Sequence, residues 1–154
     1  MSEYPLTVLL KIREGEKDAA IAAYAQASNL RAQARTELES LQAEQVELTT
    51  RRQEAREMRS NADDIQQIRS ISEYVAGLEL ESADLDIKIA AAAHGLELAE
   101  VALTEKRREM AKAETELNAV VSHQDKWQQE RKAELAKKAA EALDDLAIQR
   151  WSRS

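Results

Sequence analysis

Apolar side chains recur with a heptad period from residue 85 to residue 127. Steps of four and three residues from Leu85 reach thirteen positions, of which eleven are apolar: Leu85, Ile89, Ala92, Leu96, Ala99, Leu103, Lys106, Met110, Ala113, Leu117, Val120, Gln124 and Trp127. A period of seven that is held this long predicts a helix that supercoils around another helix. The helix needs a partner along its whole length, and the first half of the chain is the candidate.

The first half carries a poorer copy of the same pattern. Its thirteen positions are Ala20, Tyr24, Ala27, Arg31, Ala34, Leu38, Leu41, Gln45, Leu48, Arg52, Ala55, Arg59 and Ala62. Small Ala side chains would let the two backbones approach closely, and Arg stems can lie along an apolar stripe while their charged ends stay in water. Polar residues in such a seam lower stability but help to set register and partner.

One strong break separates the two patterns. The segment 60–64 reads Ser-Asn-Ala-Asp-Asp, and Ser60 followed by Asp63 resembles a capping box at a helix start. We therefore expect a single hairpin over residues 1–154, with helix one at about 5–59, a turn at about 60–64 and helix two at about 65–150. Ser70 with Glu73 is a second candidate start. The predicted fold class is all-α, a long antiparallel two-helix coiled-coil hairpin with unequal arms.

Both ends of the chain carry features that the packing of two helices along one seam does not explain. Pro5 suits the first turn of a helix, with Thr7 or Ser2 as its cap. The run from Tyr4 to Ile12 is the most hydrophobic of the first half, and it either packs against helix two or grips another protein. Past Trp127 helix two has no partner in the chain, and an unpartnered amphipathic helix either frays or binds something.

Composition agrees with long helices rather than a thick core. Aromatic residues make up 3% of the chain, Phe is absent and charged residues reach 33%. No Cys is present, no secretory leader is recognised at the start, and no run of apolar residues is long enough for a membrane span. We expect a cytoplasmic protein without direct membrane insertion.

The net charge of −7 argues against nucleic acid and anionic membranes as partners. Between Glu73 and Glu100 seven acidic residues face Lys88 alone, which indicates either a solvated face or a docking site for a basic partner. His94 with Glu97 is too small a set for a metal, and paired rods offer no pocket for acid–base chemistry. We expect no enzyme activity, no cofactor, no metal and no catalytic residue.

Several short motifs resemble those of the central-stalk proteins of type III secretion, the YscO/FliJ-like (SctO) family. The first part of the resemblance is Tyr4-Pro5-Leu6, Leu10, Ile12-Arg13-Glu14 and Lys17-Asp18-Ala19-Ala20. The second part is Ile71, Tyr74-Val75, Leu78, the run from Leu98 to Glu109, and Trp127 with Glu130. The tail after Trp127 departs from the family pattern, being Ala-rich and less acidic.

The resemblance implies a non-enzymatic hairpin similar to the coiled coil of the rotary ATP synthase γ subunit. Such a stalk inserts into the hexameric export ATPase, activates it and links it to the export gate at the cytoplasmic base of the apparatus. Some members also bind secretion chaperones. The isolated protein is expected to be a monomer. The Tyr-Pro-Leu start favours an injectisome over a flagellum.

The resemblance also implies two partner-binding ends. The ATPase end comprises Leu6, Leu10, Arg13, Lys17, Trp127 and Arg131. The export-gate end comprises Ile65, Ile68, Tyr74, Val75 and Leu78. Arg13 and Lys17 are candidate salt-bridge donors to the ATPase ring.

Two other functions stay open from the sequence. One is a generic coiled-coil adaptor or chaperone-escort protein, in which the unpaired helix binds clients. The other is a homodimeric spacer, in which two copies form a four-helix bundle over the weak first seam. A prefoldin-like chaperone would need strands, and no apolar pattern of period two is present.

Overall fold

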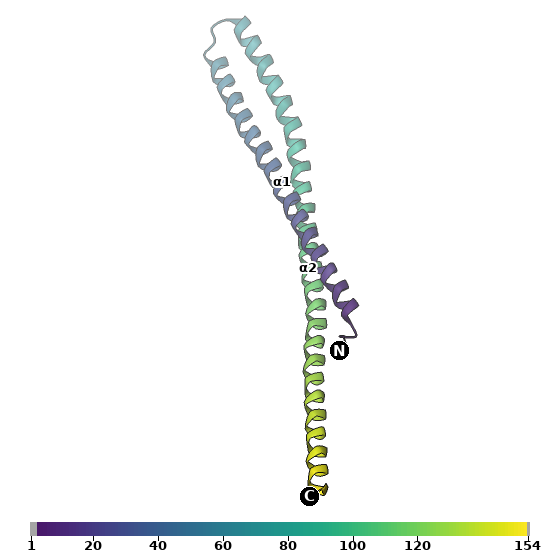
Figure 1. The fold of residues 1–154 in the computed structure, drawn as a ribbon. Coiled ribbons are helices and arrows are strands. Elements are labelled where there is room, and N and C mark those ends of the chain that lie inside the picture. The colour runs from purple at the N-terminus through teal and green to yellow at the C-terminus, as the bar shows by residue number, and fades with distance from the viewer. Residues whose placement is uncertain (1–2, 154) are drawn as a thin grey trace. The chain divides into compact units, whose positions relative to one another are not determined.

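Two long α-helices make up nearly all of the computed structural model, which describes residues 3–153 (Figure 1). Helix α1 spans Thr7–Ser60 and helix α2 spans Ile65–Arg153, so they contain 54 and 89 residues. No strand occurs within the described range. The predicted all-α fold, an antiparallel two-helix hairpin with unequal arms, is confirmed.

Contacts between the helices show that they run in opposite directions. As residue numbers rise along α1 they fall along α2, in the ion pairs Arg13–Glu116, Arg31–Glu100 and Arg56–Glu79. All thirteen seam positions from 85 to 127 are buried or half-buried. In the first arm twelve of the thirteen are, and the exception is Arg59, which is exposed. The heptad pattern therefore identified the packed faces of both helices.

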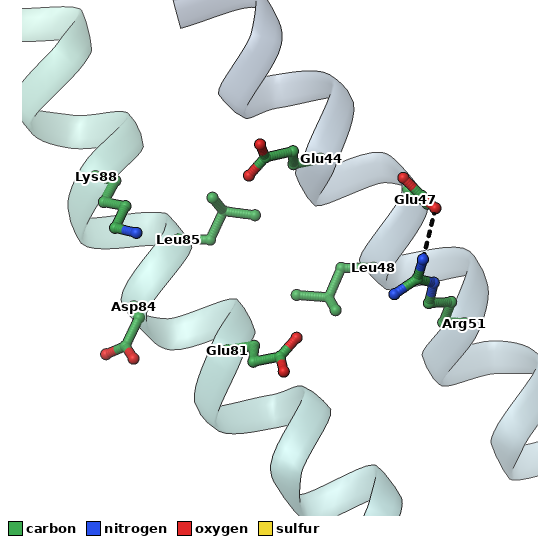
Figure 2. Close-up of a pocket in the computed structure, with 8 residues that line it drawn as sticks. All are labelled: Glu44, Glu47, Leu48, Arg51, Glu81, Asp84, Leu85 and Lys88. Carbon is green, nitrogen blue, oxygen red and sulfur yellow. Dashed lines mark hydrogen bonds and ion pairs between the residues drawn. The ribbon is translucent and has the colours of Figure 1, made fainter.

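The chain forms two compact units, and both helices contribute to each. The first unit, Ala23–Arg107, contains the turn and the largest apolar cluster. Leu48, Leu78 and Leu85 are buried there, with Leu41 and Ile89 packed against them. Leu48 and Leu85 point toward each other from opposite helices in Figure 2. Because the interior is only two side chains deep, no large side chain is fully enclosed.

The second unit combines residues 3–22 with residues 108–153. Its buried apolar side chains are Tyr4, Ala113 and Val120. Among the described residues of the whole chain, no helical stretch is long and apolar enough to cross a lipid bilayer.

Helix α1 begins at Thr7, after a turn formed by Pro5 and Leu6. The Thr7 amide and hydroxyl both donate to the Tyr4 carbonyl, at 3.2 and 2.5 Å. Thr7 is itself the first residue of α1, and these two bonds join the helix to the turn that precedes it. The prediction that Thr7 caps the helix stays a prediction. Ser2, the alternative cap, lies outside the described residues.

The turn between the helices uses a different cap from the one that the sequence suggested. The Ser60 hydroxyl donates to a carbonyl one turn earlier in α1 and so belongs to the end of that helix. Asp64 caps α2, because its Oδ1 accepts the amide of Gln66 at 3.2 Å. The predicted capping box from Ser60 to Asp63 is therefore wrong. Ser70 lies inside α2, which continues through it.

Candidate partner-binding surfaces

An aromatic cluster fixes the start of the chain to α2. Tyr4 is only 6% exposed, and its hydroxyl lies 2.5 Å from His123 Nδ1. The Tyr4 ring meets the Trp127 ring edge-on, with centroids 5.5 Å apart, and the Arg131 guanidinium lies 5.8 Å from the Trp127 centroid. We call these four residues the N-terminal clasp. The clasp joins the two predicted residues Trp127 and Arg131, and it adds Tyr4 and His123.

The hydrophobic run after Tyr4 divides between packing and exposure. Leu9 and Leu10 are half-buried, whereas Leu6, Val8 and Ile12 are 39%, 71% and 51% exposed. Both interpretations of this run therefore apply, each to different residues. The exposed residues leave an apolar surface on this part of α1.

Arg13 is held within the molecule. Its Nη1 donates to Glu16 at 2.9 Å and to Glu116 at 3.1 Å. The hydrogen bond and charge of Glu16, with a smaller contribution from Glu116, raise the pKa of Arg13, so it stays cationic. Lys17, one turn further along α1, is half-buried. A contact between Arg13 and a partner would compete with these two carboxylates.

The C-terminal extension, residues 128–153, continues α2 beyond Trp127 and includes Arg131 of the clasp. Every residue in it is exposed, and it passes the N-terminal end of α1 without another helix beside it (Figure 1). Its exposed large apolar residues are Leu135, Leu143, Leu146, Ile148 and Trp151. Leu135, Leu143 and Leu146 lie within roughly 80° of one another around the helix, so these three form one apolar face that is available to a partner.

The predicted export-gate residues fall into two groups. Ile65, Ile68 and Tyr74 are 75%, 38% and 52% exposed, close to the turn. Val75 and Leu78 are each only 4% exposed, because they continue the seam toward the turn at heptad spacing from Leu85. A partner cannot reach these two without separating the helices. A groove of about 560 Å³ beside the turn is lined by Met58, Asn61, Ala62, Gln66, Gln67, Ser70 and Ile71.

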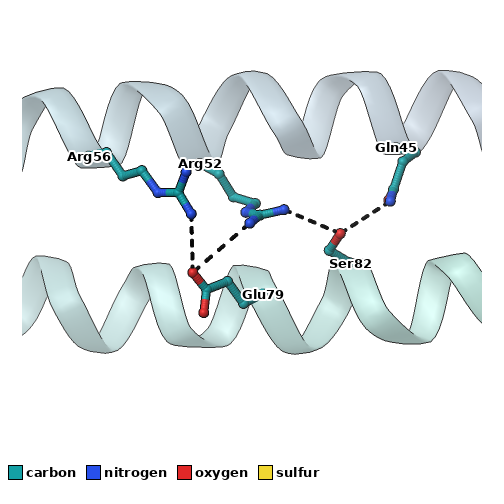
Figure 3. A network of polar contacts seen from close by, with 5 residues as sticks. All are labelled: Gln45, Arg52, Arg56, Glu79 and Ser82. Carbon is teal, nitrogen blue, oxygen red and sulfur yellow. Dashed lines mark hydrogen bonds and ion pairs between the residues drawn. The ribbon is translucent and has the colours of Figure 1, made fainter.

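Polar residues interrupt the seam in the middle of the turn-containing unit (Figure 3). Gln45 Nε2 donates to buried Ser82 at 3.1 Å, and Arg52 Nη1 lies 3.5 Å from the same hydroxyl. Arg52 and Arg56 both approach Glu79, at 4.0 and 3.3 Å. This network links the two helices at one register.

A further groove, between the helices of the turn-containing unit, is acidic and shallow. It has a volume of about 350 Å³ and is lined by Glu44, Glu47, Leu48, Arg51, Glu81, Asp84, Leu85 and Lys88 (Figure 2). Arg51 pairs with Glu47 at 2.8 Å on one helix. Among residues 3–153 no three His, Asp or Glu side chains come together as a metal ion would require. The surfaces described here suit recognition of other proteins.

Comparison with known proteins identifies the family. The model of the YscO-like family, described as YscO-like protein, matches residues 1–149. The chain belongs to the YscO-like family. The family is associated with the type III secretion apparatus, and this YscO-like protein is a coiled-coil, stalk-like member of it.

A solved structure shares the fold of this YscO-like protein. It is described as a homolog of YscO, CT670 from Chlamydia trachomatis, with a TM-score of 0.51 and 20% sequence identity. The match covers 97% of this chain and 99% of that chain. At this identity the likeness supports the hairpin fold alone. No sequence among the curated proteins matches this YscO-like protein.

Sequence reasoning missed two members of the clasp. The sequence placed Tyr4 only in a hydrophobic run that either packs against helix two or contacts another protein, and it assigned no role to His123. One signal was available, because His123 and Trp127 are four residues apart and thus neighbours on one helix face. The antiparallel packing of the two helices brings the start of the chain alongside this face, so that Tyr4 contacts both.

Proposed function

We propose that this YscO-like protein is the central stalk of an injectisome export apparatus in the bacterial cytoplasm. It inserts into the hexameric export ATPase, activates it and links it to the export gate. The observation that carries the proposal is the family match over residues 1–149, on a chain whose described residues form a two-helix hairpin. The ATPase binds the clasp end with the C-terminal extension, and the gate binds near the turn.

The exposed surfaces support this assignment of the ends. The C-terminal extension offers apolar side chains together with Arg131, Lys132, Lys137 and Lys138, so it can meet both apolar and acidic surfaces of a ring. Near the turn, Ile65 and Tyr74 stay accessible. Secretion chaperones are further candidate partners. Val75 and Leu78 act through the packing that supports the gate-binding surface.

ATP hydrolysis by the purified hexameric export ATPase of the same system tests the proposal. We expect the full chain to stimulate turnover, and a chain that ends at Lys132 to lose most of the stimulation while its seam still packs. A full chain that binds the hexamer without changing turnover would contradict the activating role. A chain that binds secretion chaperones but not the hexamer would favour the escort function instead.

The contribution of Arg13 needs a variant that also removes its partner on α2, so that Glu116 is not left unpaired; the second partner, Glu16, is exposed to solvent. Arg13→Gln combined with Glu116→Gln removes both partners of the internal pair. Arg35→Gln with Glu39→Gln makes the same change at an exposed pair elsewhere on α1. We expect the first double variant, and not the second, to weaken stimulation. Equal stimulation by both would remove Arg13 from the ring-binding surface, and Lys17→Gln tests its neighbour in the same way.

A further inference from the structure

A second apolar stripe runs along α2, on the side away from α1. It consists of Leu80, Ala83, Ile87, Ala91, Leu98 and Val101, and we call it the outer stripe. Its four large members are 70%, 70%, 57% and 61% exposed in the order Leu80, Ile87, Leu98 and Val101. All six residues lie in the turn-containing unit, Ala23–Arg107.

Helical geometry places the outer stripe opposite the seam. Ile87 lies two residues from both Leu85 and Ile89, which corresponds to roughly 200° around the helix. Those two residues pack in the apolar cluster against α1, whereas Ile87 is exposed. The spacings of seven from Leu80 to Ile87, and of three from Leu98 to Val101, keep these side chains on one face. α2 therefore has two apolar faces in this segment, and α1 covers only one.

The alignment distinguishes this stripe from ordinary exposed aliphatic residues. Single exposed Leu or Val side chains are common on protein surfaces. On α1 of the same unit, Leu30 and Val46 are 54% and 68% exposed but lie sixteen residues apart. The outer stripe instead keeps to one side of α2 over about six turns, with His94 at the heptad position between Ile87 and Leu98. This is the pattern that a further helix would pack against.

Charge along the edges of the outer stripe selects the kind of helix. Helical positions of about 100° per residue place Glu79, Asp86 and Glu97 along one edge and Asp84 along the other. Glu79 and Asp86 already contact α1, through Arg56 and Gln45, so Glu97 and Asp84 are the carboxylates that a partner would meet first. Lys88 is the only basic residue between positions 73 and 100, against seven acidic ones. Two such acidic surfaces repel each other, so a second copy of this chain is a poor occupant. An anionic membrane is excluded by the same repulsion.

We infer that the outer stripe binds a basic amphipathic helix of another protein. The aliphatic face of that helix covers Leu80, Ile87, Leu98 and Val101, and its Lys or Arg side chains pair with the acidic edges. Binding weakens as salt rises, since the flanking pairs lie at the solvent-exposed rim. This inference does not depend on the stalk function, because it uses neither the clasp nor the C-terminal extension.

Fluorescence anisotropy with two synthetic peptides tests the inference on the full chain. Both peptides carry the same Leu residues at heptad spacing over about four heptads. One has Lys and Arg at the flanking positions, and the other has Glu. We expect the basic peptide to bind, with an affinity that falls as salt is added. The acidic peptide should bind at least about tenfold more weakly. Equal binding of the two peptides, or no binding of either, would overturn the inference.

Substitutions on the outer stripe locate the binding site. Ile87→Ser with Leu98→Ser should lower the affinity for the basic peptide by at least about tenfold. Burial of each aliphatic side chain contributes roughly that factor to the affinity. Leu30→Ser with Val46→Ser is the matched control on α1 and should leave binding unchanged. If the control pair weakens binding as much, the peptide does not recognise the outer stripe and the inference fails.

Charge reversal provides a gain-of-binding test. Asp84→Lys with Glu97→Lys should shift preference toward the acidic peptide, which a merely destabilised protein would not do. Circular dichroism checks that all variants keep their helical content.

Sedimentation of the full chain at the same concentrations should show a monomer. A dimer that Ile87→Ser with Leu98→Ser abolishes would identify a second copy as the occupant and refute the inference. Stimulation of the export ATPase, measured separately on the same variants, should not change.

Discussion

At the residue scale, the polar layer in the seam is the main departure from an apolar coiled coil. Ser82 is buried at 7% exposure and receives hydrogen bonds from Gln45 and Arg52. Gln45 Oε1 and Arg52 Nε are buried without a hydrogen-bond partner. Unsatisfied buried polar atoms lower stability, while a polar layer disfavours slipped registers. The polar layer therefore favours a single register of the two helices and lowers the stability of the hairpin.

Replacing Gln45 by an apolar residue should stabilise the hairpin. Gln45→Leu removes a buried atom without a partner and adds apolar contact, so the free energy of unfolding should rise by about 1 kcal/mol. Urea unfolding followed by helical circular dichroism measures the change. Gln42→Leu, at an exposed position three residues earlier, is the control and should give no gain. A loss of stability in Gln45→Leu would mean that the polar contacts outweigh the desolvation.

The residues also show where sequence reasoning stops. Val75 and Leu78 were assigned to an exposed surface because they stand beside Tyr74 in a family motif. The same heptad count that identified Leu85 reaches both when it is continued toward the turn, and both are buried. The segment around Tyr4 could not by itself decide between packing against helix two and binding another protein, because the partner His123 lies more than a hundred residues later.

At the element scale, the period of apolar residues determines the two helices, and their ends depend on single hydrogen bonds. The heptad positions from 85 to 127 are all packed, since burial acts on every turn of the helix. The helix ends were less predictable. Ser60 and Asp64 are both good capping residues, and only the path of the turn decides which side chain meets a free amide.

Loss of the α2 cap should destabilise the hairpin at its turn. Asp64→Ala leaves the Gln66 amide without its acceptor and should lower the free energy of unfolding by about 1 kcal/mol. Thermal unfolding measures the loss. Asp64→Ser should recover most of it, because the hydroxyl can accept the same bond. Asp63→Ala, one residue earlier, should have the smaller effect, and an equal effect would argue against Asp64 as the cap.

The glycines within α2 should be replaceable. At Gly77 and Gly95 an added Cβ would have no atom within 4 Å, and neither glycine has positive φ. Gly77→Ala and Gly95→Ala should therefore each raise the free energy of unfolding by about 1 kcal/mol, because Ala loses less backbone entropy in a helix. Ala76→Gly should lower it by a similar amount. A gain that is absent at either glycine would show that flexibility there is not a cost to folding.

At the scale of the whole molecule, the main feature is the large solvent-accessible surface. The accessible surface is 11887 Å², whereas a compact protein of this mass, 17.3 kDa, exposes roughly 7,800 Å². Stability is therefore the sum of many small contacts along the seam rather than the product of one core. Regions without seam contacts should open independently of the rest.

Hydrogen exchange should reveal this uneven stability. Amides of residues 135–150, in the C-terminal extension, should exchange at least about a hundredfold faster than amides of residues 78–89, which pack in the main apolar cluster. Mass spectrometry of the exchanged, digested protein measures both segments at once. Added export ATPase should slow exchange in the extension if the stalk function is correct. Uniform rates in the free protein would contradict the difference in packing.

The position of the turn also determines the order in which contacts can form. The partners Arg56 and Glu79 are separated by 23 residues and Gln45 and Ser82 by 37, but Arg13 and Glu116 by 103 and Tyr4 and His123 by 119. Closing a longer loop costs more chain entropy. The contacts between the helices should therefore form first beside the turn and then progressively further from it. The N-terminal clasp should therefore close last and open first. During synthesis the start of α1 stays unpaired until the part of α2 that holds His123 and Trp127 has been made.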